Sequence, residues 1–123
     1  MHSERLLDHF QNPRNPGELP PPAVVVDVTN PACGDMLRLS ARVENGRVAD
    51  ARFLTRGCTA SIAASSALTE WMIGKTSPEL AAITAAAIED ALGGLEPASK
   101  HAAVLCVDAA RQWQRKLSEN RPQ

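Results

Sequence analysis

Residues 56–67 read Arg56-Gly57-Cys58-Thr59-Ala60-Ser61-Ile62-Ala63-Ala64-Ser65-Ser66-Ala67. The pattern predicts the end of a strand, a glycine, and a cysteine that opens a helix running to about Ile73. A helix N-terminus carries partial positive charge and free backbone N–H groups, so a thiol there tends toward the thiolate. Thiolate is the form that binds metals and attacks sulfur. We therefore interpret Cys58 as the first member of a metal or sulfur site whose other members come from elsewhere in the chain.

The residues before this stretch predict a three-stranded antiparallel sheet. Residues 23–29 are rich in β-branched side chains, and residues 36–44 alternate apolar and polar side chains. Asn45-Gly46 is a strong signal for a two-residue hairpin turn, so residues 47–56 are expected to return beside the preceding strand. The apolar members of this returning strand are Val48, Ala49, Ala51, Phe53 and Leu54.

Helices are predicted at the start of the chain and throughout its second half. Residues 3–11 form a short helix that Ser3 can cap, with an apolar stripe of Leu6, Leu7 and Phe10. Further helices are expected over residues 79–83 and 97–118, and residues 84–92 either continue the first of these or form a second short helix. The inward residues of the last helix are expected to be Ala103, Val104, Val107, Ala110 and Trp113. Strands followed by helices are typical of the α+β class.

Length and composition predict one globular domain, residues 1–123, with a single core. The net charge of −1 and the scarcity of aromatic residues, two Trp and two Phe with no Tyr, argue against a nucleic-acid partner. No apolar run of 18 residues is present, and the first residues lack the pattern of a signal peptide, so we expect no membrane association. We expect a cytoplasmic protein whose three cysteines stay reduced.

Cys33 and Asp35 are the first candidate partners of Cys58. They lie in the predicted turn before the second strand, where Gly34 lets the backbone bend. Because antiparallel neighbours return to the same end of a sheet, the hairpin is expected to bring this turn close to Cys58. The loop would then offer one soft and one hard ligand. The alternative is a buried turn cysteine, with Asp35 as a local hydrogen-bond acceptor.

His101 is the next candidate, in the first turn of the last predicted helix. Imidazole is the commonest metal-binding side chain, although a lone histidine is often structural or merely exposed. Cys106 follows five residues later and points about 140° away from His101 around the helix. The two side chains cannot easily bind one ion, so we interpret Cys106 as a core thiol.

Three motifs together resemble the IscU/NifU/SufU-type iron–sulfur cluster assembly scaffolds. The motifs are Asn30-Pro31-Ala32-Cys33-Gly34-Asp35, then Arg56-Gly57-Cys58-Thr59-Ala60-Ser61-Ile62-Ala63-Ala64-Ser65-Ser66-Ala67-Leu68-Thr69-Glu70-Trp71, and the opening Leu7-Asp8-His9-Phe10-Gln11-Asn12-Pro13-Arg14-Asn15-Pro16-Gly17. The resemblance runs from about residue 4 to residue 112. The short region between Gly74 and His101 is similar to the IscU and NifU branches and lacks the longer insertion of the SufU branch.

The resemblance implies a SufE/NifU-like α+β fold, in which a three-stranded antiparallel sheet packs against about four to five helices. It implies a scaffold or carrier, not an enzyme, that binds iron, a [2Fe–2S] cluster or zinc at one end of the sheet. By position, Cys33, Asp35 and Cys58 match family ligands or assembly residues, and His101 matches the histidine of the family's His-Cys pair. The implied partners are a cysteine desulfurase and iron–sulfur recipient proteins.

Ala102 departs from the family pattern, which has a third cysteine directly after the histidine. That missing thiol is, by resemblance, the sulfur-receiving residue during assembly. Two thiolates with one histidine and one aspartate suit tetrahedral Zn²⁺, and they also suit a labile [2Fe–2S] cluster because histidine can replace cysteine on iron. Residues 95–100 differ from the Leu-Pro-Pro-Val-Lys chaperone signal of the IscU branch, so we do not expect that chaperone partner.

Three hypotheses follow for the function. The first is a scaffold or carrier that holds its cargo at Cys33, Asp35, Cys58 and His101. The second is a structural or regulatory zinc-binding module derived from the scaffold fold, without assembly activity. The third is a thiol enzyme with Cys58 as sulfur acceptor or nucleophile and His101 as base, which no recognisable oxyanion element or substrate pocket supports.

Overall fold

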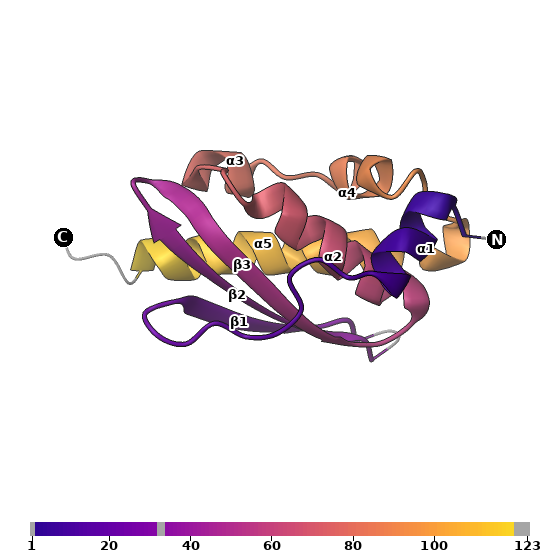
Figure 1. The fold of residues 1–123 in the computed structure, drawn as a ribbon, viewed down its shortest axis with the longest axis horizontal. Helices are drawn as coiled ribbons and strands as arrows, with labels where there is room; N and C mark the ends of the chain where they lie inside the picture. The colour runs from indigo at the N-terminus through magenta and orange to yellow at the C-terminus, as the bar shows by residue number, and fades with distance from the viewer. Residues whose placement is uncertain (1, 32–33, 120–123) are drawn as a thin grey trace.

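The computed structural model describes residues 2–31 and 34–119 of the chain (Figure 1). Their elements are α1 (Glu4–Gln11), β1 (Val24–Thr29), β2 (Met36–Glu44), β3 (Arg47–Arg56), α2 (Thr59–Met72), α3 (Ser77–Ala81), α4 (Ala85–Ala91), the 3₁₀ helix η1 (Pro97–Ser99) and α5 (His101–Glu119). This is the predicted α+β order of strands followed by helices. None of the described helices is long and apolar enough to cross a bilayer.

The sheet is the predicted antiparallel meander, with strand order β1-β2-β3. β2 and β3 have the predicted bounds, because the turn between them is strongly specified by its residues. Asn45 and Gly46 both have positive φ, 53° and 77°, as a two-residue hairpin turn of this kind requires. The register pairs Met36 with Arg56, so the start of β2 lies beside the end of β3.

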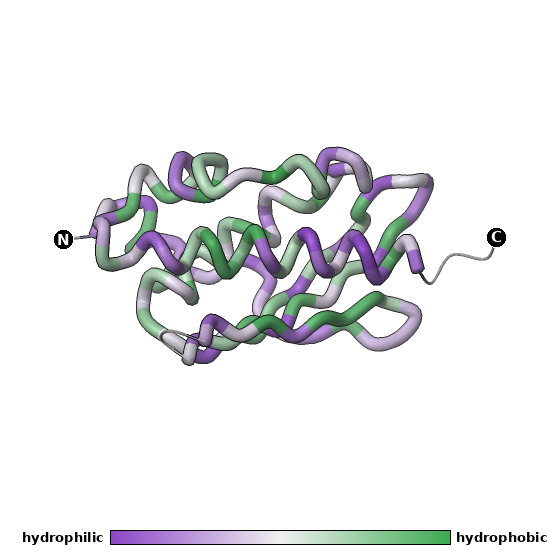
Figure 2. Tube along the Cα trace, turned by 180° about the vertical axis from the view of Figure 1, so that it is seen from behind, coloured by the Kyte–Doolittle hydropathy of each residue, from purple (hydrophilic) through white to green (hydrophobic). Residues whose placement is uncertain are grey.

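Helices cover one face of the sheet. α2 packs on β3, and α5 packs on β1 and β2 and also contacts α2 (Figures 1 and 2). α4 packs on α2 and α5 away from the strands, and α3 packs on α5 near the β2–β3 hairpin, where its Glu79 forms an ion pair with Arg47 of β3 (Figure 1). The core between the layers takes its largest buried side chains from every layer: Leu6, Leu37, Leu39, Leu68, Met72, Leu80, Ile88, Leu105 and Trp113.

The last helix differs from its prediction in two ways. The predicted helix over residues 97–118 is divided at Lys100 into η1 and α5. Ala103, Val107, Ala110 and Trp113 are buried as predicted, but the prediction for Val104 was wrong, since half of this residue is exposed. Val104 lies on the same helical stripe as the exposed Asp108 and Arg111, four and seven positions later, which faces solvent.

α5 also bonds to β1, the strand at one edge of the sheet. The indole N–H of Trp113 donates to the carbonyl oxygen of Val24 at 3.0 Å. The ammonium group of Lys116 donates to the carbonyl oxygen of Val25 at 2.6 Å. These bonds connect the second half of α5 to the sheet. The first turn of α5 lies at the other end of this helix, far from these bonds.

α1 begins after Ser3, whose hydroxyl accepts the N–H of Leu6 as predicted. The predicted apolar stripe was wrong in part, because Leu7 and Phe10 are each 38% exposed while His9 is buried beside Leu6. His9 takes the inward position because α2 offers it a polar partner: its Nδ1 lies 2.8 Å from the hydroxyl of Ser66.

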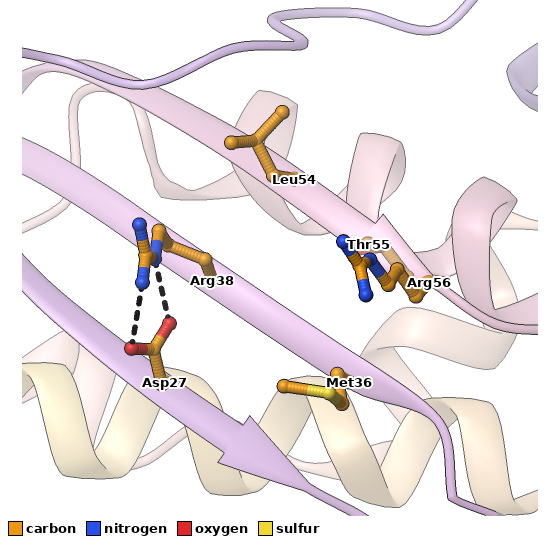
Figure 3. A pocket seen from close by; sticks show the side chains of 6 residues that line it. All are labelled: Asp27, Met36, Arg38, Leu54, Thr55 and Arg56. Atoms are coloured by element: carbon orange, nitrogen blue, oxygen red, sulfur yellow. Dashed lines mark hydrogen bonds and ion pairs between the residues drawn. The ribbon is translucent and has the colours of Figure 1, made fainter.

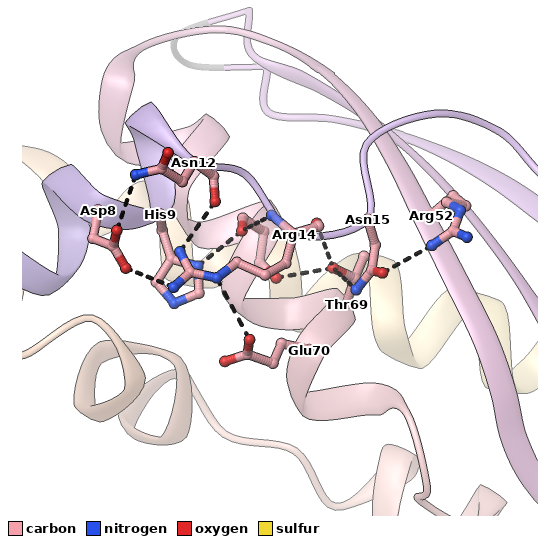
Figure 4. A network of polar contacts seen from close by, with 9 residues as sticks. Asp8, His9, Asn12, Arg14, Asn15, Arg52, Thr69 and Glu70 are labelled. Atoms are coloured by element: carbon pink, nitrogen blue, oxygen red, sulfur yellow. Dashed lines mark hydrogen bonds and ion pairs between the residues drawn. The ribbon is translucent and has the colours of Figure 1, made fainter.

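The segment after α1 is held on α2 by hydrogen bonds of Arg14 to Ser66 and Thr69, of which Arg14 and Thr69 are labelled in Figure 4. The N–H of Arg14 donates to the Ser66 hydroxyl oxygen at 2.8 Å, and the Thr69 hydroxyl donates to the carbonyl of Arg14 at 3.1 Å.

Burial lowers the pKa of His9, and the nearby guanidinium of Arg14 lowers it further. A neutral His9 therefore belongs to the folded state.

The other face of the sheet is open around one hollow, lined by Asp27, Met36, Arg38, Leu54, Thr55 and Arg56 (Figure 3). Arg38 and Asp27 form a two-point ion pair across β2 and β1, at 2.8 and 3.1 Å. Leu54, which we expected among the apolar members of β3, is 47% exposed on this face. The reason is the strand alternation, since its neighbour Phe53 points to the helices and is buried.

Candidate metal centre

The turn before β2 brings Asp35 into position. Gly34 has a φ of +78°, a left-handed conformation that glycine adopts readily. The N–H of Gly34 donates to the carbonyl of Asn30 at 2.7 Å, and the N–H of Asn30 donates to the carbonyl of Asp35 at 2.8 Å. These bonds close the turn and leave Asp35 only 7% exposed. Cys33, predicted as a ligand in the same turn, lies outside the described residues.

The hairpin brings Asp35 to the start of α2, as the sequence predicts. Since Met36 pairs with Arg56, Asp35 lies opposite Gly57, the residue before Cys58. A Cβ atom on Gly57 would lie 2.6 Å from the carboxyl carbon of Asp35, so glycine is needed for this approach. Cys58 is the N-cap of α2, but its side chain caps no backbone N–H. Instead its Sγ atom lies 3.6 Å from Oδ2 of Asp35.

His101 reaches the same point from α5. It is the first residue of that helix, with 29% of its side chain exposed. Its Nε2 atom lies 3.6 Å from Sγ of Cys58 and 3.4 Å from Oδ2 of Asp35. Three residues that are far apart in the sequence thus converge at one end of the molecule, where β2, α2 and α5 begin.

The three ligand atoms form a nearly equilateral triangle with sides of 3.4–3.6 Å. In tetrahedral coordination, bonds of about 2.3 Å to sulfur and about 2.0 Å to nitrogen and oxygen place ligand atoms about 3.3–3.5 Å apart. The triangle therefore has the size of three corners of a tetrahedron around one metal ion. Asp35, Cys58 and His101 are also close enough as a group to hold a metal, each offering one atom.

Ser61 is a member of this site that the sequence prediction missed. It is completely buried on the first turn of α2, its hydroxyl donates to Oδ2 of Asp35, and its oxygen lies 3.3 Å from Sγ of Cys58. The signal for it was the spacing, because residues three apart on a helix lie on the same side.

Cys106 lies outside the group, as predicted. It is fully buried in α5, and burial raises the pKa of its thiol to about 12. Ala102, where the family pattern has a cysteine, is also completely buried beside His101. The described part of the site therefore offers one sulfur ligand, the thiol of Cys58.

Residues 1–120 match the model of the NifU-like N terminal domain. The chain belongs to this family. It is similar to an iron–sulfur cluster assembly scaffold protein, IscU 1 of Archaeoglobus fulgidus, with 44% identity over 91% of this chain and 73% of the relative. It is 39% identical to the iron–sulfur cluster assembly enzyme IscU of Drosophila melanogaster, over 90% of this chain and 74% of the relative.

A solved structure shares the fold of this NifU-like domain. It is the N-terminal part of a NifU-like protein from Brucella abortus, with a TM-score of 0.78 and 22% identity. The match covers 97% of this chain and 95% of that one. The predicted family and its fold, a three-stranded antiparallel sheet packed on helices, are confirmed.

Proposed function

We propose that this chain is an iron–sulfur cluster assembly scaffold in which residues 1–123 act as one domain. The observation that carries the proposal is the triangle of Asp35, Cys58 and His101, whose sides of 3.4–3.6 Å suit three ligands of one tetrahedral ion. Family membership and the scaffold names of IscU relatives support the same function. Cys33 remains the predicted fourth ligand.

The chemistry of the site is binding and transfer, and the proposal gives the protein no catalytic role of its own. Iron or a [2Fe–2S] cluster is the cargo, held by one thiolate, one imidazole and one carboxylate among the described residues. Cys58 is exposed, so its sulfur is accessible to another protein. Mixed ligands at an accessible site suit the release of a metal or cluster better than four thiolates that enclose it.

The proposed partners are a sulfur donor, which we expect to be a cysteine desulfurase, and the recipient proteins that take the cargo. A donor has to bring sulfur within bonding distance of the ligands, and Cys58 is the most exposed of the three described ligands. Zn²⁺ fits the same ligand types, because it accepts sulfur, nitrogen and oxygen ligands together. We propose it as a competitor for the site, not as the cargo.

The deciding experiment is metal and sulfide analysis after anaerobic reconstitution with iron, cysteine and a desulfurase, with a visible absorption spectrum. The expected result is bound iron and acid-labile sulfide in the parent protein, and loss of both in Cys58→Ser. Cys106→Ala is the matched control, since it removes a thiol that lies outside the ligand group. A parent protein that holds only zinc and resists reconstitution would overturn the scaffold proposal in favour of a zinc-binding module.

A further inference from the structure

The hydroxyl of Ser61 lies between two of the proposed ligands. It donates its hydrogen bond to Oδ2 of Asp35, the same oxygen that faces His101 at 3.4 Å and Cys58 at 3.6 Å. The residue has no exposed surface, so water does not compete for this bond. The Ser61 hydroxyl therefore helps to hold the oxygen of Asp35 that faces the site.

Ser61 is itself held in place by α2. It lies in the first turn of that helix, and its carbonyl oxygen accepts a hydrogen bond from the hydroxyl of Ser65 at 2.7 Å. The backbone of Gly57 closes the other side of the carboxylate, with no room for a further atom. Asp35 is thus enclosed between Gly57, the residue before Cys58, and the buried donor Ser61, three residues after it.

We propose that Ser61 is a positioning residue for cargo binding, which acts on the metal through Asp35. This inference rests on the proposed function, because it takes Asp35 and Cys58 as ligands. The hydroxyl has one hydrogen, and donating it to Asp35 fixes the carboxylate with Oδ2 toward Cys58 and His101. Partners that orient a ligand in this way typically change metal affinity by about 10- to 100-fold when they are removed.

If Ser61 had a purely structural role, Ser61→Ala would weaken α2 itself and would not lower metal affinity while the helix stays intact. Alanine has the higher helix propensity, and it removes only one oxygen atom from the packed first turn of α2. Loss of metal affinity without loss of the helix would therefore point to the hydrogen bond on Asp35. The size of that loss should depend on Asp35 being present, which a double-mutant cycle measures.

The test is Co²⁺ binding to the full chain, measured by absorption titration and by competition with a chelator. We expect Ser61→Ala to weaken Co²⁺ binding about tenfold and to shift the Co²⁺ absorption bands, because the oxygen ligand moves. In an Asp35→Ala background, Ser61→Ala should change neither quantity further. Ser66→Ala is the matched control: it is an equally buried serine on the same helix, and its hydroxyl bonds to His9 and to the N–H of Arg14, away from the ligands.

Two results would overturn the role of Ser61. One is Co²⁺ binding by Ser61→Ala with the affinity and spectrum of the parent. The other is an equal loss of affinity in the presence and absence of the Asp35 carboxylate, which would place the effect elsewhere. Cys58→Ser separates the two proposals, since its failure to bind Co²⁺ supports the metal site whatever Ser61 does. Unchanged binding by Cys58→Ser would overturn the site itself.

Discussion

Gly57→Ala is the most direct test of how the metal centre is built. The added Cβ would lie 2.6 Å from Cγ of Asp35, and 2.8 and 2.9 Å from its two carboxylate oxygens. Ordinary contact begins at 3.4 Å, so the carboxylate has to retreat by about 0.8 Å. A displacement of this size takes Oδ2 out of its place in the triangle, and we expect metal affinity to fall by about 10- to 100-fold, or roughly 1.4–2.7 kcal/mol.

Combining Gly57→Ala with Asp35→Ala tests whether the clash with the Asp35 carboxylate causes the loss of affinity. All three of the nearest atoms belong to the Asp35 carboxylate, and Asp35→Ala removes all of them. In that background Gly57→Ala should leave metal affinity unchanged and alter the free energy of unfolding by no more than about 1 kcal/mol. The assays are Co²⁺ titration and urea unfolding followed by circular dichroism. Parent-like metal affinity in Gly57→Ala would refute the reasoning, because it would mean that Asp35 is not a ligand.

Three further predictions concern His9, Trp113 and the reactivity of two cysteines. His9 is neutral when folded because burial lowers its pKa below 6.5, so its contribution to stability is present above pH 6.5 and is lost as the pH falls toward the lowered value. The free energy of unfolding should fall more steeply between pH 7 and pH 5 in the parent than in His9→Gln, and equal slopes would contradict this. Trp113→Ala should cost about 3–5 kcal/mol in urea unfolding and Trp113→Phe clearly less, because Trp113 is fully buried; a loss under 1 kcal/mol for alanine would count against the packing described. Iodoacetamide should modify the exposed Cys58 in the native protein and leave Cys106, with its pKa raised to about 12, unmodified until urea is added, as peptide mass mapping can show; equal labelling of the two would be the contrary result.

The sheet could be predicted from the sequence, and so could the meeting of two site residues, Asp35 and Cys58. Asn45-Gly46 fixes the hairpin, and a fixed hairpin brings Asp35 opposite Gly57, so the meeting of Asp35 with Cys58 follows from local signals. The predicted bounds of β2 and β3 match the structure for the same reason, and those of β1 differ by one residue. An apolar side chain on a strand does not itself say which face is covered, and Leu54 lies exposed on the open face.

Long-range packing accounts for what the residues alone could not predict. Nothing in the residues around His101 says that α5 places its first turn beside Cys58, so only the family resemblance pointed to it. His9 is buried because Ser66 faces it from α2, more than 50 positions along the chain. Ser61 was within reach of local reasoning, since it lies three residues after Cys58, but its partner Asp35 comes from another element.

The ligands come one each from the starts of β2, α2 and α5, so a bound ion would cross-link three separate parts of the backbone. A ligand that binds only the folded state adds its binding free energy to stability, about 2.7 kcal/mol at a free concentration one hundred times the dissociation constant. The thermal midpoint of this protein should then report how much cargo it carries. Delivery to a recipient would remove the cross-link in the same step, leaving the first turn of α5 less firmly attached to the sheet.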